Sequence, residues 1–442
     1  MRINLYKYID IFDVESMDKR ILILSRSFRA GDAITTLNLF SQWPKTELFC
    51  ASMTGDEFSS SFNEFYILGA DEVQFCFPFT KLVHIGNSHI ADSKQKKLRT
   101  DIQRKSLKRN IYEKFLLPIL QRMDLYETRY KMILSDKFIN WIEKVSPDII
   151  YTSIGDIPMA HLIFDINKRF PKIKLAVHCF DDWLSPTYKI LYESKHRRRA
   201  ELLLCKILDL ASFRFTSSDK MALEYNERYG YRFKCFPNPV KINSIDSVVA
   251  KSSITNIVFA GKIGWHNNLA IKDMVASVDN LNRKGVKIQF DIYSDCTLEQ
   301  RDYFLGDVAE STIFHNPMPN AQILKVLAAA HILFLPISIT EHTEKFTRYS
   351  MSTKMGEYLS TGVPTIYCGP SSIAMTEFLK SKNCAIIVEQ SGEYYIENAI
   401  MKALENSDEI KNMCNCGIEL AQSYFDIEVV SHDFANILNG TL

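Results

Sequence analysis

Short apolar runs alternate with longer segments of helical spacing along the whole chain. A short apolar run bounded by charged residues is typical of a strand buried on both faces of a parallel sheet. The runs before residue 240 predict strands at 19–25, 47–51, 72–77, 148–152, 174–178, 213–216 and 234–236. The later runs predict strands at 254–260, 287–293, 312–315, 332–335, 365–368 and 385–388. Apolar residues at helical spacing predict helices between them, for example at 33–40, 159–169, 195–210 and 321–330.

Two separate series of alternating strands and helices predict an α/β fold. The expected architecture is two Rossmann-like, doubly wound domains that face each other across a cleft. Residues 1–240 form the predicted first domain and residues 241–442 the second. Between the two series, residues 244–253 are small and polar, which is typical of a linker.

A dense basic stretch interrupts the first series. Its cations are Lys94, Lys96, Lys97, Arg99, Arg104, Lys105, Lys108 and Arg109. An apolar run follows at 115–120, and together they predict one or two helices inserted into the first domain near residues 93–130. Basic residues beside apolar ones suit an interfacial helix on an anionic membrane surface. A solvated helical face is the alternative, and the sequence leaves both open.

Composition narrows the class of protein. The chain has 442 residues, enough for two domains, and its formal net charge of +1 gives no overall attraction to nucleic acid. Its ten cysteines are scattered without a CxxC pair or a His/Cys cluster at zinc spacing, which predicts reduced thiols. The first residues lack the apolar core of a signal peptide, and no apolar run approaches the ~18 residues of a membrane span. We therefore expect a cytoplasmic protein that binds no nucleic acid.

The segment from Ser350 to Pro364 has the pattern of a ligand-binding helix. It lies between two apolar runs, which predicts a strand, a long polar loop, a helix, a short turn and a second strand. Ser350 or Ser352 can cap the helix, because a short hydroxyl side chain accepts from the free amides of the first turn. Gly362 fits the left-handed position that ends a helix.

Lys354 and Glu357 are three residues apart, so they project from one face of this helix. A helix N-terminus with a lysine attracts phosphate, and a neighbouring carboxylate can accept two hydrogen bonds from the diol of a ribose. The alternative is a surface helix with an ion pair between the two side chains.

One run of this segment resembles the donor-site signature of GT-B glycosyltransferases of the GT4 type. The run is Thr353-Lys354-x-x-Glu357-Tyr358-Leu359-x-x-Gly362-Val363-Pro364. In that family it reads roughly Ser-x-Pro-Thr-Lys-x-x-Glu-Tyr-x-Ala-x-Gly-x-Pro. The resemblance implies a nucleotide-sugar donor bound in the second domain by Ser352, Thr353, Lys354 and Glu357.

A second element of the resemblance is Val258-Phe259-Ala260-Gly261-Lys262, which is similar to the family's strand and Gly-Arg loop. In the family a cation of this loop contacts the donor diphosphate. The resemblance therefore adds Gly261 and Lys262 to the donor site, where lysine keeps the charge of arginine without its bidentate geometry. The segment 237–240 resembles the family's Pro-Asn-Gly-Val segment, which closes the first domain before the hinge.

Two positions depart from the family pattern. Asn267 stands where the family has a further lysine, and Tyr349 stands where many relatives have a glutamate eight residues before Glu357. Glu341 and Glu344 lie in the same predicted loop, 338–351, and are the candidates to replace that carboxylate.

Acceptor-side candidates lie at the predicted strand ends of the first domain. They are Gly31 with Asp32 in the loop after the first strand, Asp156, His178, Asp181 and Asp182. His178 with Asp181 is the pair expected to carry the chemistry, with Asp156 as a third catalytic candidate. The alternative for each carboxylate is a helix cap or a solvated turn.

The predicted function is a metal-independent glycosyltransferase that uses no cofactor. The resemblance implies a nucleotide-sugar donor, retention at the anomeric centre, and a glycan or lipid-linked acceptor in polysaccharide or glycoconjugate synthesis. Two alternatives remain: a nucleotide-sugar epimerase or hydrolase on the same fold, and a non-catalytic protein that binds a glycan or another subunit.

Overall fold

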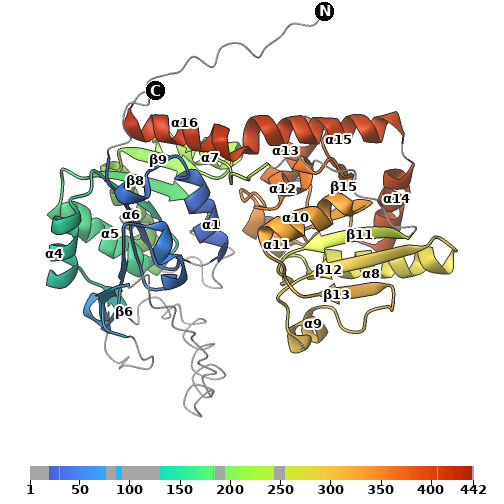
Figure 1. The fold of residues 1–442 in the computed structure, drawn as a ribbon, viewed down its shortest axis with the longest axis horizontal. Coiled ribbons are helices and arrows are strands. Elements are labelled where there is room, and N and C mark those ends of the chain that lie inside the picture. Colours follow the sequence, from blue (N-terminus) through green and yellow to red (C-terminus); the bar gives the residue numbers. More distant parts are fainter. Residues whose placement is uncertain are drawn as a thin grey trace, which may run out of the picture.

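The computed structural model describes residues 19–28, 30–75, 86–91, 130–182, 184, 195–242, 254–405 and 407–440. These ranges form two α/β domains, each built on its own sheet (Figure 1). The basic run at 94–109 and the predicted linker at 244–253 lie outside the described residues, as does nearly all of the predicted insertion. Within the described ranges, no helix combines the length and apolar character that crossing a bilayer requires.

The first domain is built on an eight-stranded sheet in the order β10-β9-β8-β7-β1-β2-β3-β5. Its strands are β1 (Ile21–Ser25), β2 (Leu48–Ser52), β3 (Glu64–Ile67), β5 (His89–Ile90), β7 (Ile149–Ser153), β8 (Lys174–Cys179), β9 (Phe213–Thr216) and β10 (Lys234–Cys235). All neighbours are parallel except β3 and β5. The strand order reverses between β1 and β7, which is the doubly wound topology predicted from the sequence.

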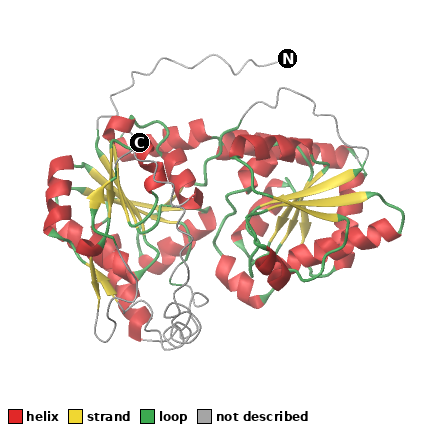
Figure 2. Ribbon diagram, turned by 60° about the horizontal axis from the view of Figure 1, so that its bottom comes forward, coloured by secondary structure: helices red, strands yellow, loops and turns green. Residues whose placement is uncertain are grey.

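Burial on both faces explains the continuous apolar runs of these strands. In β1, Leu22 and Leu24 belong to one core cluster, whereas Ile21 and Ile23 belong to the cluster on the other face. Figure 2 shows the strands of each sheet between helices. The helices of the first domain are α1 (Ala30–Leu39), α4 (Asp136–Val145), α5 (Ile157–Arg169), α6 (Lys195–Leu210) and α7 (Asp219–Tyr229). Shorter elements are η1 (Lys45–Glu47), η2 (Asp56–Ser61), η3 (Ala70–Glu72) and the pair β4 (Val73–Phe75) and β6 (Tyr130–Met132).

Side-chain caps fix where several of these helices begin. The hydroxyl of Ser135 accepts from the amide of Phe138 at the start of α4, and that of Ser218 accepts from Met221 at the start of α7, both at 3.1 Å. Gly230, at a φ of 73°, ends α7 in the left-handed conformation that glycine adopts at little cost.

The second domain is built on a six-stranded parallel sheet in the order β13-β12-β11-β14-β15-β16. Its strands are β11 (Thr255–Ala260), β12 (Ile288–Tyr293), β13 (Thr312–His315), β14 (Ile332–Pro336), β15 (Thr365–Cys368) and β16 (Ile386–Val388). Its helices are α8 (Asn268–Arg283), α9 (Leu298–Phe304), α10 (Asn320–Ala329), α11 (Glu341–Thr347), α12 (Met355–Ser360), α13 (Ala374–Lys382), α14 (Glu393–Leu404) and α15 (Asp408–Leu420). The order reverses between β11 and β14, so this domain also has a topological switch point.

The chain crosses between the domains a second time near its end. A π-helical turn, η6 (Ala421–Phe425), leads from α15 over the second domain to α16 (Ile427–Asn439) over the first (Figure 1). The two crossings touch, because Val240 donates to the carbonyl of Phe425 at 2.8 Å and accepts from the amide of Ile427 at 2.9 Å. Phe434 of α16 packs edge-on against Phe40 in the first-domain core. The last helix thus belongs structurally to the first domain.

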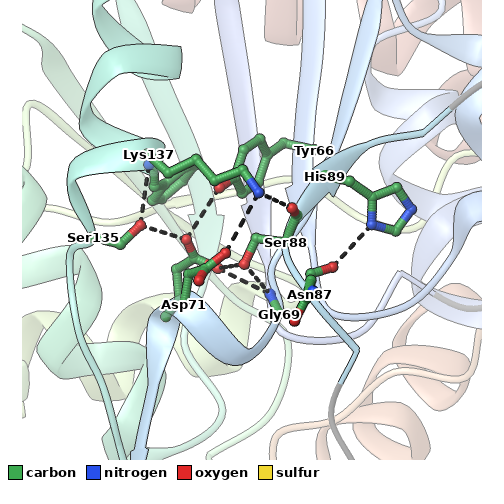
Figure 3. A network of polar contacts seen from close by, with 10 residues as sticks. Tyr66, Gly69, Asp71, Asn87, Ser88, His89, Ser135 and Lys137 are labelled. Atoms are coloured by element: carbon green, nitrogen blue, oxygen red, sulfur yellow. Dashed lines mark hydrogen bonds and ion pairs between the residues drawn. The ribbon is translucent and has the colours of Figure 1, made fainter.

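A fully buried carboxylate joins β3, η3, β5 and α4 of the first domain (Figure 3). Glu72 accepts from the hydroxyls of Tyr66 at 3.1 Å and Ser135 at 2.6 Å, and from the amide of Gly69 at 2.9 Å. It also accepts from the hydroxyl of Ser88. Four donors compensate for the loss of water around the carboxylate, so the network fixes residues 86–91 against the sheet.

Every predicted strand has a counterpart in the structure, with its ends displaced by at most a few residues. Two predictions are wrong in detail. The helix after β1 begins at Ala30 rather than residue 33, and the expected loop 338–351 contains the helix α11. Strand β3 was not predicted, because only Phe65 and Tyr66 of its four residues are buried and the apolar run is too short to recognise.

Candidate functional site

The switch point of the second sheet brings two loops together at the carboxyl ends of β11 and β14. The carbonyl of His266, in the loop after β11, accepts from the amide of Ser338 at 2.7 Å. The Ser338 hydroxyl accepts from the amide of Leu269 at 3.1 Å. Open α/β sheets bind their ligands at this place.

Asn267 holds the loop after β11 in shape. Its side-chain oxygen accepts from the amide of Gly264, and its side-chain amide donates to the carbonyl of Lys262, both at 2.9 Å. The side chain is buried at 4% exposure. The residue that stands in place of a family lysine therefore shapes the loop and supplies no cation.

The side chain of Lys354 lies directly over Gly261. A Cβ atom at position 261 would lie 2.4 Å from Cε and 3.1 Å from Nζ of Lys354, so only glycine leaves room for it. Burial lowers the pKa of Lys354, while Glu357 and Asp295 oppose this shift through their charges. The structure thus gathers Gly261, Lys354, Glu357 and Asp295 at one end of β11.

Tyr358 fixes α12 to β11. Its side chain is fully buried, and its phenol oxygen accepts from the amide of Ala260 at 2.8 Å. Because Ala260 precedes Gly261 and Tyr358 follows Glu357, this bond holds the glycine loop and the Lys354 helix together.

The start of α12 differs from the prediction. The helix is six residues long and begins at Met355, with Lys354 at the N-cap position and no side chain capping it. The Ser352 hydroxyl accepts from the amide of Lys354 at 3.3 Å, in the turn before the helix. Ser350 bonds to Asp181 instead, so neither serine is the predicted cap. Gly362 has the predicted left-handed conformation, with a φ of 69°.

Lys262 and Thr353 are both exposed next to this group. Within the described ranges, the ammonium of Lys262 forms no hydrogen bond or ion pair. It is therefore available to a ligand at the carboxyl edge of β11.

Tyr349 extends from the second domain into the core of the first. Its side chain is 6% exposed and packs in a core cluster of the first domain. Its carbonyl accepts from the Ser218 hydroxyl at 2.7 Å, and its phenol is hydrogen-bonded to Glu224. The position where relatives have a glutamate thus joins the two domains.

The two candidates to replace that glutamate have other partners. Glu341 is exposed and forms an ion pair with Lys345 one turn along α11. Glu344 accepts from the Ser372 hydroxyl. The structure contradicts the expectation that one of them takes the place of the missing carboxylate.

His178 lies inside the first domain, which contradicts the expectation that it faces the cleft. Its side chain is 0% exposed, its Nδ1 is 2.8 Å from the Tyr151 hydroxyl, and its ring stacks on Phe180. Burial lowers the pKa of His178 to about 3, so the ring stays neutral near pH 7. A ring without solvent contact cannot reach an acceptor hydroxyl.

Asp156 caps α5 and pairs with the loop after β1. Its side chain accepts from the amide of Met159 at 2.8 Å and lies 2.5 Å from a guanidinium nitrogen of Arg26. This pair joins the loops at the switch point between β1 and β7. Asp156 is therefore a helix cap, which was the alternative to a catalytic role.

Gly31 and Asp32 lie within α1, not in a loop before it. Asp32 is in the third position of the helix, so it does not occupy the N-cap position.

Asp181 and Asp182 follow β8 and have different roles. Asp182 is buried, accepts from Tyr225 at 2.9 Å and forms an ion pair with Arg228, also at 2.9 Å. Asp181 is exposed and accepts from the Ser350 hydroxyl of the second domain at 2.7 Å. Desolvation raises the pKa of Asp181, and the bond from Ser350 opposes this shift. Of the first-domain candidates, Asp181 is the one that contacts the segment carrying Lys354.

Two further titratable groups near Lys354 were not predicted. Asp295 follows β12, and the strand-end rule applied to the second sheet could have indicated it. His266 lies in the loop after β11, where burial and the charge of Lys354 lower its pKa. No sequence pattern marked His266.

Neither a family model nor a curated protein sequence matches this chain significantly. Solved structures match nearly all of it. HepE from Anabaena, in complex with UDP, has a TM-score of 0.60 at 14% identity, over 95% of this chain and 100% of that one. Sucrose-phosphate synthase from Thermosynechococcus elongatus has a TM-score of 0.58 at 12% identity, over 96% and 99%. A glycosyltransferase from Rickettsia africae has a TM-score of 0.58 at 9% identity, over 96% and 98%. The chain therefore has the GT-B glycosyltransferase fold.

Proposed function

We propose that this protein is a glycosyltransferase that takes a sugar from a nucleotide-sugar donor held in its second domain. The observation that carries the proposal is the ammonium of Lys354 over Gly261, at the switch point of a doubly wound sheet. HepE has been solved in complex with UDP and with UDP-glucose, and this supports a donor of that class.

In the proposed site, Lys354 and the exposed Lys262 bind the diphosphate, with Ser352 and Thr353 beside them. Gly261 leaves room for the diphosphate to approach the main chain, and Glu357 accepts hydrogen bonds from the ribose hydroxyls. Two cations stabilise the diphosphate as the bond from the anomeric carbon to its oxygen breaks. We therefore propose a reaction that needs no metal ion and no cofactor. From the family resemblance we also propose that it retains the anomeric configuration.

The acceptor is proposed to be a glycan or a lipid-linked glycan bound against the first domain. Asp181 is the candidate to orient its hydroxyl, because Ser350 links it to the segment that carries Lys354. His178 and Asp156 are not part of this proposal, since one is buried and the other caps a helix. We further propose that the protein acts in the synthesis of a surface polysaccharide and that the basic run 94–109 contacts an anionic membrane.

A non-catalytic binding protein is the second candidate, and a specific observation favours it. Tyr349 joins the domains at the position of a family carboxylate, and neither Glu341 nor Glu344 replaces it. This candidate predicts nucleotide binding without turnover.

Turnover of nucleotide sugars separates these possibilities. The protein is incubated with UDP-, GDP-, ADP- and dTDP-sugars, each with a set of oligosaccharides as acceptors and with or without EDTA, and the products are separated by chromatography. We expect release of one nucleoside diphosphate, unaffected by EDTA and abolished in Lys354→Ala. Isomerised nucleotide sugar without release would indicate an epimerase, and binding without any product would indicate the non-catalytic protein.

A second experiment tests Asp181. Asp181→Asn should lower the turnover number and leave the affinity for the nucleotide unchanged, whereas Asp165→Asn, on the exposed side of α5, should leave both unchanged. An equal decrease of the turnover number in both variants would show that Asp181 is not part of the site.

A further inference from the structure

Three aromatic rings form a cluster on the second domain next to the proposed donor site. Trp265, in the loop after β11, is 41% exposed. Its ring centroid is 4.6 Å from that of His342 and 4.8 Å from that of Phe346, both on α11. Because α11 follows β14, the cluster lies at the switch point between β11 and β14, where such sheets bind ligands.

The cluster is held in a defined position. Asn267 fixes the loop that carries Trp265, and the bond from Ser338 to His266 joins this loop to the chain after β14. The Thr340 hydroxyl accepts from the amide of Thr343 at 3.1 Å and so caps α11. Single exposed aromatic residues are ordinary, but a tryptophan fixed against two other rings at a sheet's ligand edge is a preorganised surface.

The cluster is close to both the proposed diphosphate site and the first domain. His266 follows Trp265 directly, and burial together with the nearby charge of Lys354 lowers the pKa of His266, so the two sites are adjacent. Tyr349 and Ser350, shortly after the end of α11, contact the first domain. Figure 1 shows α11 on the side of the second domain that faces the first.

We propose that Trp265, supported by His342 and Phe346, is a stacking surface for a sugar ring of the acceptor. A pyranose has faces made of C–H groups, which bury apolar area against an aromatic ring, while its hydroxyls at the edge remain free for hydrogen bonds. This inference rests on the proposed function, because it assumes that the acceptor is a saccharide. It adds a surface on the second domain that binds one sugar ring of an acceptor bound against the first domain.

A nucleobase is the competing occupant, since bases also stack on aromatic rings. The structure has a second aromatic pair better suited to that role on the other side of β11. Tyr293 and His315 stack at 4.4 Å at the carboxyl ends of β12 and β13, and His315 is held by Asp291 at 2.8 Å. A nucleobase can therefore stack on Tyr293 and His315, so the surface at Trp265 is assigned to the acceptor.

Tryptophan fluorescence tests the assignment on the full-length protein. The chain has four tryptophans, and the emission lost in Trp265→Phe isolates Trp265 because Trp43, Trp141 and Trp183 are present in both proteins. Acrylamide quenching is measured with short oligosaccharides of glucose, mannose, galactose and N-acetylglucosamine, and separately with UDP. We expect at least one oligosaccharide to protect Trp265. We expect Trp265→Ala to weaken its binding about tenfold, measured by calorimetry, without changing UDP affinity.

The controls separate this inference from the proposed function. Trp265→Phe keeps an aromatic face and should retain most of the saccharide affinity, and Tyr303→Ala, an exposed aromatic on α9, should change nothing. If no oligosaccharide protects Trp265, or if UDP alone protects it, the stacking surface is wrong even when UDP binds. If oligosaccharides protect it but no nucleotide binds, the stacking surface stands and the proposed donor function fails.

Discussion

The phenol oxygen of Tyr358 accepts a hydrogen bond from the main-chain amide of Ala260 at 2.8 Å. This bond connects the helix after Lys354 to the end of β11, two elements that are about a hundred residues apart in sequence. It sets the position of Lys354 over Gly261, on which the proposed donor site depends.

Tyr358→Phe should weaken both folding and nucleotide binding. It leaves the Ala260 amide without its acceptor, which destabilises the protein by about 1–3 kcal/mol. Urea unfolding measures the first effect, and calorimetry with a nucleoside diphosphate measures the second. Tyr367→Phe is the matched control, because that buried hydroxyl bonds to Thr376 at 2.8 Å away from the site. If Tyr358→Phe binds nucleotide as tightly as Tyr367→Phe, this bond does not position the site.

Gly261→Ala should reduce nucleotide binding without unfolding the protein. The new methyl group would collide with the end of the Lys354 side chain, which is flexible and can move away. Gly261 does not have a positive φ, so alanine adds no backbone strain there. We expect about a tenfold loss of affinity with little change in the melting temperature. Gly155→Ala is the control, since a Cβ atom at that position meets no atom within 4 Å.

The protonation of Lys354 should make nucleotide binding depend on pH. Burial lowers its pKa from the ordinary value of 10.5, so the ammonium loses its proton below pH 10.5. As pH rises, the affinity for a diphosphate should therefore begin to fall below pH 10.5. Arginine stays charged throughout this range, so Lys354→Arg should lack this decrease. Equal pH profiles for the two proteins would show that Lys354 does not bind the diphosphate.

The same lowered pKa predicts an effect on stability. The folded state binds this proton less tightly than the unfolded chain, so the lysine disfavours folding below its folded pKa. This loss of stability begins to shrink as pH rises above the folded pKa, and it is gone only above the unfolded pKa of about 10.5. Lys354→Met should therefore be at least as stable as the unmodified protein at pH 7 and show a weaker rise of stability in alkaline solution. Thermal unfolding across this pH range measures both, and a clearly less stable Lys354→Met would contradict the sign.

Tyr349→Glu should destabilise the contact between the domains rather than restore the family's site. The new carboxylate would lie beside Glu224 and would replace an aromatic ring that packs in the first-domain core under the guanidinium groups of Arg228 and Arg348. Loss of a buried aromatic ring costs about 3–5 kcal/mol. Tyr349→Phe keeps the ring and should lose only the hydrogen bond, about 1 kcal/mol. Thermal unfolding compares the two. A Tyr349→Glu protein as stable as Tyr349→Phe would show that this position is not buried between the domains.

The sequence predicted the fold well because the strands of both sheets are buried on both faces. Continuous apolar runs such as Ile332–Pro336 mark such strands without knowledge of their partners. Short or partly exposed elements such as β3 and α11 have no comparable pattern, and their positions depend on contacts with distant segments.

The candidate site was predicted unevenly, for physical reasons. Lys354, Glu357 and Gly261 belong to two motifs that follow β14 and β11 in the sequence, and the structure brings them together. His178 also follows from the strand-end rule, but its ring turns into the core, and the direction of a side chain at a strand end depends on tertiary packing. The role of Tyr349 could not be predicted, since its partners are on the other domain.

Calorimetric titration with nucleoside diphosphates tests the central claim most directly. UDP, GDP, ADP and dTDP are titrated into the unmodified protein, Lys354→Ala, and the control Lys345→Ala, which removes an exposed lysine of α11. Loss of charged hydrogen bonds worth about 1.5–3 kcal/mol corresponds to a roughly 10- to 100-fold weaker complex. We predict that one diphosphate binds, that Lys354→Ala weakens it by this factor, and that Lys345→Ala does not. If no diphosphate binds, or if Lys354→Ala binds as well as Lys345→Ala, the proposed donor site is wrong.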